Sequence, residues 1–198
     1  MISHVISMWF AAGLALVAMV LFASLAGCEQ RRAYQPPERP LGEIELLSDA
    51  FANGEAIPVR YTGDGEDISP PLVWSSLPEG TSELALIVDD PDAPLPRPWV
   101  HWLIYGIPAT SDRLAEAIAP GQKMPFLGGA FQGRNSSGGF GYRGPSPPRG
   151  HGTHHYHFKL YALDCKLRID PGADKPALLA AMKGHILSQG ELVGTYER

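Results

Sequence analysis

The chain has 198 residues, enough for one domain of ordinary size and a short appendage, and this length excludes a large multidomain protein. Charged residues make up 19% of the sequence, the formal net charge is -5, and no basic run is longer than Arg31-Arg32. Binding to a nucleic-acid backbone depends on clustered cations, so nucleic acid is not expected as a partner.

The N-terminal segment differs in composition from the rest. Residues 1–27 contain no Asp, Glu, Lys or Arg, and residues 9–25 are almost wholly apolar, as in a secretory signal peptide. Leu25-Ala26-Gly27-Cys28 resembles the cleavage box of bacterial lipoproteins, in which the cysteine is acylated, with palmitate among the expected chains. We therefore expect residues 1–27 to be a lipoprotein signal peptide, Cys28 to be lipidated, and the Pro-rich residues 28–40 to be a tether.

An uncleaved N-terminal membrane anchor is the alternative for this segment. A signal peptide normally begins with positive charge, but this one offers only His4, and the arginines Arg31 and Arg32 follow the apolar run. By the positive-inside rule, that arrangement favours a cytoplasmic domain. As a lipoprotein, the chain is instead expected in the bacterial cell envelope. In a diderm host Glu29, in place of Asp, predicts the outer membrane with the domain on its periplasmic side.

Residues 41–198 are predicted to form one mainly β domain. Short apolar runs punctuated by Pro and Gly recur, and this spacing is typical of antiparallel sheets. The runs lie at residues 43–47, 57–61, 72–74, 84–90, 99–107 and 153–163.

One peripheral helix is predicted near the C-terminus. Asp174 can cap it and Pro176 suits its first turn, while apolar residues recur at helical spacing at Leu178, Leu179, Met182 and Ile186. Gly190 is expected to break this pattern before a last run at residues 192–196. The Gly- and Pro-rich segment 120–152 shows no periodicity and is predicted to be a long functional loop.

Three motifs carry candidate ligand-binding groups. They are Asp89-Asp90-Pro91-Asp92-Ala93-Pro94, Trp99-Val100-His101-Trp102, and a Gly- and Pro-rich run at residues 141–150 that leads into His154-His155-Tyr156-His157-Phe158. Together they resemble the phosphatidylethanolamine-binding protein family, specifically its bacterial Raf-kinase-inhibitor-like branch, over about residues 43–197. The resemblance implies a β-sandwich of two antiparallel sheets with Greek-key connections. This fold agrees with the mainly β domain, with one or two peripheral C-terminal helices, that the sequence pattern predicts.

The resemblance also implies a small anion-binding pocket. Its residues would be Asp90, His101, Pro148, His154 and Tyr156, with Asp92 and Pro94 shaping the adjoining loop. At His155 the sequence departs from the family, where Arg is frequent, so the pocket rim is less permanently cationic.

Strand alternation supports part of this site independently. Side chains on a strand alternate between two faces, so His154, Tyr156 and Phe158 point one way while His155 and His157 point the other. If Phe158 faces the core, His154 and Tyr156 can line a pocket.

Taken singly, the pocket residues also have structural interpretations. Asp90 before Pro91 could only close a turn, His101 could be a satisfied core histidine, and Tyr156 could be part of a β core.

The leading functional hypothesis is a non-catalytic, envelope-tethered binding protein for a small anionic ligand, such as phosphate or a phosphoethanolamine head group. No cofactor is expected. A protein–protein regulator is the alternative, with the pocket rim as its contact surface. Its candidate contacts are Trp99, Phe126, Phe131, Phe140 and Tyr142.

Hydrolysis and metal binding are weaker hypotheses. The sequence has no G-x-S-x-G motif, although Asp90 with two histidines could support acid–base chemistry. The histidines at positions 151, 154, 155 and 157 have a spacing that suits metal ligands, but strand alternation divides them between two faces, so no metal site is expected.

Overall fold

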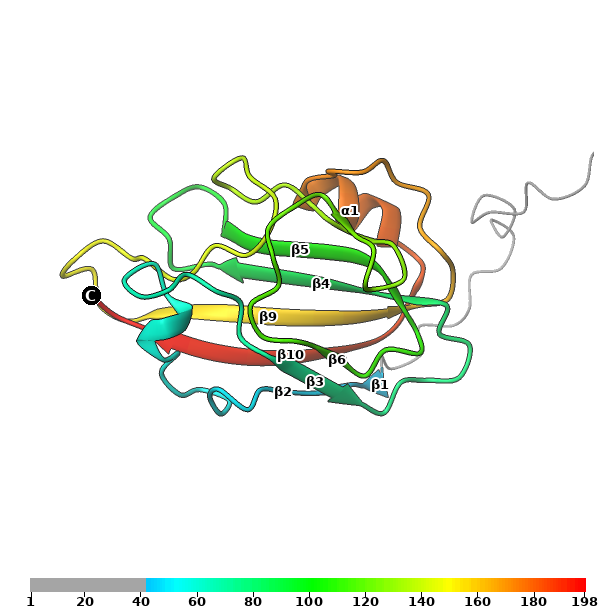
Figure 1. Ribbon diagram of the computed structural model, residues 1–198, viewed down its shortest axis with the longest axis horizontal. Coiled ribbons are helices and arrows are strands. Elements are labelled where there is room, and N and C mark those ends of the chain that lie inside the picture. The colour runs from blue at the N-terminus through cyan, green and yellow to red at the C-terminus, as the bar shows by residue number, and fades with distance from the viewer. Residues whose placement is uncertain (1–41) are drawn as a thin grey trace, which may run out of the picture.

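The computed structural model describes residues 42–198, in which two β-sheets pack face to face (Figure 1). The predictions for residues 1–27, for Cys28 and for the tether lie outside the described residues. The larger sheet has the strand order β1 (Gly42–Glu43), β10 (Ile186–Tyr196), β9 (His154–Leu163), β4 (Glu83–Asp90), β5 (Trp99–Pro108), β8 (Ala130–Gln132) and β7 (Lys123–Met124). The smaller has the order β2 (Glu45–Leu47), β3 (Leu72–Ser75) and β6 (Arg113–Leu114).

All the strand pairs are antiparallel except β1 with β10. The principal core lies between the sheets, where Trp74 of β3 and Leu46 of β2 belong to the same buried cluster as Trp102 of β5 and Phe158 of β9. This arrangement confirms the predicted mainly β, antiparallel fold.

A second apolar cluster covers the outer face of the larger sheet. Helix α1 (Lys175–Met182) packs Leu178 and Met182 against Ile87 of β4 and Leu103 of β5. Strand β4 is consequently buried on both faces along its whole length. Burial on both faces explains why residues 84–88 are a continuous apolar run instead of an alternating one.

Helix α1 begins where the sequence predicts and ends earlier. The Asp174 carboxylate accepts a hydrogen bond from the Ala177 amide at 3.0 Å, which caps the helix. Past Met182 the chain turns at Gly184, whose φ of +82° favours glycine, and Ile186 already belongs to β10. The placement of Ile186 on the helix was therefore wrong. No helix within residues 42–198 is long and apolar enough to cross a membrane.

Two other sequence-based expectations were also wrong in detail. The run at residues 57–61 forms a 3-10 helix (Val59–Tyr61), because Pro58 has no amide hydrogen with which to continue a strand ladder. Gly190 does not interrupt β10. The segment 120–152 is largely irregular, as predicted, but it also contributes the short strands β7 and β8.

We predict that Gly190→Ala destabilises the domain by about 1–3 kcal/mol, a typical cost of overpacking. A Cβ at this position would lie 2.2 Å from the backbone oxygen of Ile44, so the chain that joins β1 to β2 would have to move. Urea unfolding measures the change. Gly139→Ala is the control, because its Cβ would meet nothing closer than 3.9 Å, and a change within about 0.5 kcal/mol is expected. Equal effects of the two substitutions would contradict the steric explanation.

Candidate ligand-binding site

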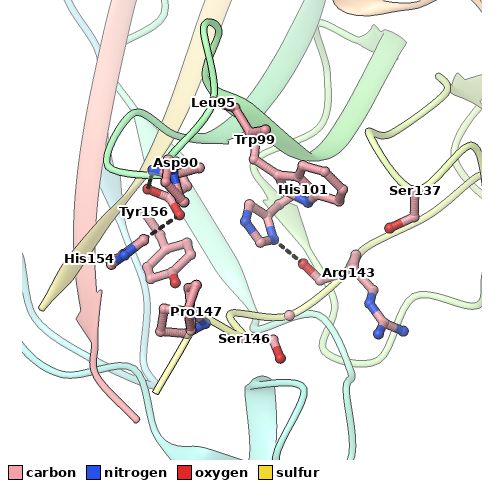
Figure 2. Close-up of a pocket in the computed structure, with 14 residues that line it drawn as sticks. Asp90, Leu95, Trp99, His101, Ser137, Arg143, Ser146, Pro147, His154 and Tyr156 are labelled. Atoms are coloured by element: carbon pink, nitrogen blue, oxygen red, sulfur yellow. Dashed lines mark hydrogen bonds and ion pairs between the residues drawn. The ribbon is translucent and has the colours of Figure 1, made fainter. Parts of the chain in front are cut away.

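The candidate site lies at one end of the larger sheet, on the left in Figure 1. Strand β4 ends there at Asp90, and its two antiparallel neighbours begin there, β5 at Trp99 and β9 at His154. The antiparallel order therefore brings together residues that are far apart in the sequence. The irregular segment that precedes β9 completes the site and supplies its outer wall (Figure 2).

These elements enclose a cavity of about 380 Å³, which is within the usual range for small-molecule sites. The five residues predicted for the pocket all line it, as does Pro94. The complete lining is Asp90, Ala93, Pro94, Leu95, Trp99, His101, Ser137, Arg143, Gly144, Ser146, Pro147, Pro148, His154 and Tyr156. Ligand binding by these residues remains a prediction.

The Asp90 side chain is buried and uses both of its oxygens. Oδ1 accepts hydrogen bonds from the amides of Asp92 (2.8 Å) and Ala93 (3.1 Å), which fixes the turn after β4. Oδ2 accepts from the Nδ1 of His154 at 2.7 Å. Asp90 therefore closes the turn through one oxygen and orients the His154 ring through the other.

His154 continues this hydrogen-bonded chain towards the surface. Its Nδ1 donates to Asp90, and its Nε2 lies 2.8 Å from the Nδ1 of the exposed His151. If His154 is neutral, its Nε2 is an acceptor, so His151 donates. The sequence placed His151 in a metal-binding hypothesis, whereas the structure assigns it to holding the His154 ring.

A backbone carbonyl group orients the ring of His101. Its Nδ1 donates to the carbonyl oxygen of Arg143, since a carbonyl can only accept. In the neutral ring the other nitrogen, Nε2, therefore carries no hydrogen and cannot donate to an anion. Burial lowers the pKa of His101 and thereby favours this neutral form, although the hydrogen bond to Arg143 and the charge of Asp90 act in the opposite direction.

Tyr156 contributes a hydroxyl group with no hydrogen-bond partner. This oxygen is buried and unpaired among residues 42–198, although a buried hydroxyl group normally has a partner. Burial and the charge of Asp90 raise the pKa of Tyr156, so the phenol keeps its proton and can donate. Its ring meets the His101 ring edge-on, with the centroids 5.1 Å apart, so the two polar groups belong to one wall (Figure 2).

The pocket has no permanent cation that points into it from the described residues. Arg143 lines the cavity, but Figure 2 shows its guanidinium pointing away from the other labelled side chains. The guanidinium is exposed and pairs with Asp67 at 3.1 Å. On the outer wall, the Ser146 hydroxyl accepts a hydrogen bond from Arg198 and keeps its own hydrogen for a ligand. The donors available to a ligand are therefore mostly neutral hydroxyl groups.

The alternation predicted for β9 is confirmed. His154, Tyr156 and Phe158 are buried, whereas His155 is exposed and His157 is half-buried on the other face. There His155 pairs with Asp92 and His157 with Glu191, each at 2.8 Å.

One other cluster of potential metal ligands occurs within residues 42–198, formed by Asp164, Cys165 and His185. His185 is already hydrogen-bonded to Asp164 at 2.8 Å. This cluster therefore gives no reason to propose a metal site.

Sequence reasoning did not assign several lining residues to the pocket. Leu95 lies in the Pro-rich loop between β4 and β5, and the irregular segment before β9 supplies Ser137, Arg143 and Ser146. The density of Pro and Gly in both segments identified them as loops. It could not show which side chains face the cavity.

Comparison with known proteins identifies the family. Residues 47–197 match the phosphatidylethanolamine-binding protein family, and the chain belongs to it. A UPF0098 protein of Methanothermobacter thermautotrophicus is 48% identical over 155 residues, covering 78% of this chain and 99% of the relative. LppC of Mycobacterium tuberculosis strain H37Rv, named as a candidate lipoprotein, is 39% identical over 202 residues, which cover 93% of this chain and 95% of LppC.

A solved structure of the same family also has this fold. The crystal structure of YbcL from Escherichia coli, described as a new member of the mammalian PEBP family, superposes with a TM-score of 0.73 and 34% sequence identity. The match covers 79% of this chain and 99% of the crystallised YbcL chain, which therefore folds without further domains. We therefore treat residues 42–198 as a unit that folds on its own.

We predict that His101 makes the folded domain sensitive to acid. Its pKa is lowered in the folded state, so below the reference pKa of roughly 6.5 the unfolded chain binds a proton that the folded state resists. The contribution of His101 to the free energy of unfolding is therefore fully present at neutral pH and is lost as the pH falls. Urea unfolding measures the free energy of unfolding at about pH 7 and at about pH 5. Between these two pH values, His101→Asn should lose less of this free energy than the parent domain, by at most about 2 kcal/mol. An identical loss in both proteins would contradict the inferred neutral, buried His101.

Proposed function

We propose that this member of the family is a non-catalytic binding protein whose pocket takes a small phosphorylated head group, of the type of phosphoethanolamine. The observation that carries the proposal is the Tyr156 hydroxyl group, which is buried and unpaired among the described residues. An unpaired buried hydroxyl group lowers stability, and a ligand oxygen that accepts its hydrogen bond would remove that cost.

Protonation of His101 would allow this residue to donate a hydrogen bond to a bound anion. His101 can donate to an anion only through Nε2, and that atom carries a hydrogen only in the protonated ring. A bound anion nearby would raise the pKa of His101, which burial lowers in the free protein. Binding is therefore coupled to proton uptake and should weaken as the pH rises.

The distribution of aromatic side chains supports a small ligand over a protein partner. Among the five aromatic residues considered as partner contacts, Phe126 is exposed, while the other four are only partly exposed. Phe131 stacks on Tyr105, and Tyr142 packs edge-on against Trp102. These side chains do not form the continuous exposed apolar patch that a regulator would present.

We predict that Tyr156→Phe weakens phosphoethanolamine binding about tenfold to a hundredfold, because a hydrogen bond to a charged group contributes about 1.5–3 kcal/mol. Stability should stay constant or rise, because the hydroxyl group that is removed has no partner within the described chain. Calorimetric titration at about pH 6 and about pH 8 should also show tighter binding to the parent domain at the lower pH. His101→Gln should abolish most of that difference.

Phosphate and acetate serve as comparison ligands in the same titrations. Unchanged affinity in both variants would place the anion site elsewhere and refute the proposed function. A loss of affinity accompanied by a large loss of stability in Tyr156→Phe would show that the hydroxyl group has a structural role.

We further propose that the domain is tethered to the bacterial envelope through lipidated Cys28. The supporting facts are the Leu25 to Cys28 box and the relationship to LppC, whose alignment covers 93% of this chain and so extends beyond the domain. The phosphorylated head groups of membrane lipids would then lie within reach of the pocket.

Cys28→Ser is predicted to abolish acylation and leave residues 1–27 attached, because the cleavage box requires the cysteine that it modifies. Intact-mass measurement of protein extracted from membranes compares the parent and the variant. A parent protein that carries no lipid, or that holds Cys28 in a disulfide, would contradict this prediction, and an unprocessed mass would support the uncleaved anchor.

A further inference from the structure

A groove separate from the candidate pocket lies between the loop that joins β4 to β5, residues 134–136, and the first turns of α1. Its volume is about 1000 Å³, and its surface is mainly apolar. It shares Leu95 and Trp99 with the pocket and none of its other lining residues. Of the five aromatic residues considered as rim contacts of a regulator, only Trp99 lines it. The groove is therefore a different surface from the pocket rim.

Exposed apolar side chains are concentrated in this groove. Five large hydrophobic residues are exposed within residues 42–198, and two of them line it, Leu95 (52% exposed) and Leu179 (41% exposed). Single exposed hydrophobic residues are normal on a protein surface, but a group of them in one groove is typical of a binding surface.

Two arginine side chains give the groove a positive charge. Arg97 lies on the β4–β5 loop and Arg134 on the facing segment, and neither pairs with a carboxylate within residues 42–198. The other charged lining residues are Asp174 and Lys175, and Lys175 already pairs with the buried Asp89. The groove therefore carries excess positive charge on a chain whose net charge is -5, and it favours an acidic occupant.

Arg134 is held in place without being neutralised. Its Nη1 donates a hydrogen bond to the carbonyl oxygen of Gly138 at 3.0 Å, and its guanidinium lies over the Phe140 ring, 5.2 Å from the centroid. Neither partner is charged, so the guanidinium keeps its full charge for an occupant. A side chain that is already fixed loses little conformational entropy when a carboxylate binds to it.

The β4–β5 loop offers hydrogen-bond acceptors to an occupant. Pro96 and Pro98 have no amide hydrogen, and the carbonyl oxygens of residues 95–98 accept no hydrogen bond from the described part of the chain. The residue before each proline is also restricted to extended backbone, so the loop is stiff. The backbone amides of a peptide can donate to these carbonyl oxygens, whereas a hydrocarbon chain has no donor.

We infer that this groove binds an extended segment of a partner protein that combines apolar side chains with Asp or Glu. The apolar side chains pack against Leu95, Val100 and Leu179, and the carboxylates pair with Arg97 and Arg134. The inference goes beyond the proposed function and does not rest on it, because the phosphorylated head group is assigned to the separate pocket.

The test begins with the selection of short random peptides, displayed on phage, on the immobilised domain of residues 42–198. Excess Leu179→Glu domain in solution removes the peptides that bind other surfaces. The selected peptides should be enriched in Asp or Glu beside large apolar residues. The tightest of them is then synthesised as the probe, together with a control peptide in which Lys replaces every Asp and Glu. The control peptide should not bind.

Groove variants locate the binding of this probe. Leu179→Glu should weaken it about tenfold to a hundredfold, the contribution of one buried leucine side chain. The double substitution Arg97→Glu, Arg134→Glu should weaken it about tenfold at low salt and less at high salt, because exposed charge pairs are screened. Arg168→Glu is the matched control, since Arg168 is exposed and lines neither cavity, and it should leave the affinity unchanged.

Melting curves show that the variants fold, and titration with phosphoethanolamine reports separately on the pocket. Failure to select any peptide that prefers the parent to Leu179→Glu would overturn the inference, as would selected peptides rich in Lys or Arg. Equal affinity of the probe for the parent and the double arginine variant would also overturn it. Loss of phosphoethanolamine binding alone would refute the proposed function and leave this inference intact.

Two other occupants would be recognised in the same experiments. Self-association of the parent domain that Leu179→Glu abolishes, without any selected peptide, would assign the groove to a second copy of the domain. Sedimentation of the parent, but not of Leu179→Glu, with phosphatidylglycerol vesicles would assign it to a membrane surface. Either result would overturn the inference of a peptide partner.

Discussion

The buried carboxylate of Asp90 fixes the arrangement of the whole pocket. Two amides of the loop after β4 donate to one oxygen, and the His154 ring at the start of β9 donates to the other. A buried carboxylate must keep such donors, because an uncompensated charge in the interior is costly. This group holds the loop that sets Leu95 at the pocket. Its bond to His154 also joins that loop to the start of β9, the strand that directs Tyr156 inward.

The long central strands were predictable because local pattern and tertiary environment agree there. The runs predicted for β4, β5 and β9 match the observed bounds to within one residue. The short β8 was missed because its pairing with Ile104 and Tyr105 depends on distant residues. Ile186 was misplaced because its spacing from Met182 suits a helix, and only the turn at Gly184 excludes that assignment.

The site was predictable in its residue types and faces but not in its hydrogen bonds. Alternation along β9 indicates that His154 and Tyr156 share a face, and resemblance to the family adds Asp90 and His101. Neither argument indicates that the carbonyl oxygen of Arg143 accepts a hydrogen bond from His101. Every residue has a backbone carbonyl group, so the residue type at a loop position does not show which donor it binds. That single contact determines which nitrogen of His101 is free, so the proposed coupling of binding to proton uptake could not be predicted from the sequence.

The charges of the adjacent residues Asp89 and Asp90 are compensated in different ways. They face opposite sides of β4, and Asp89 is neutralised by Lys159 and Lys175 under α1, so its charge does not act unopposed on the pocket. Asp90 instead receives hydrogen bonds from two amides and an imidazole, with no lysine or arginine paired to it within residues 42–198. A fully ionised phosphate would therefore face an excess of negative charge. A head group that also carries a proton or an ammonium group would not, and this favours a zwitterionic ligand over a bare anion.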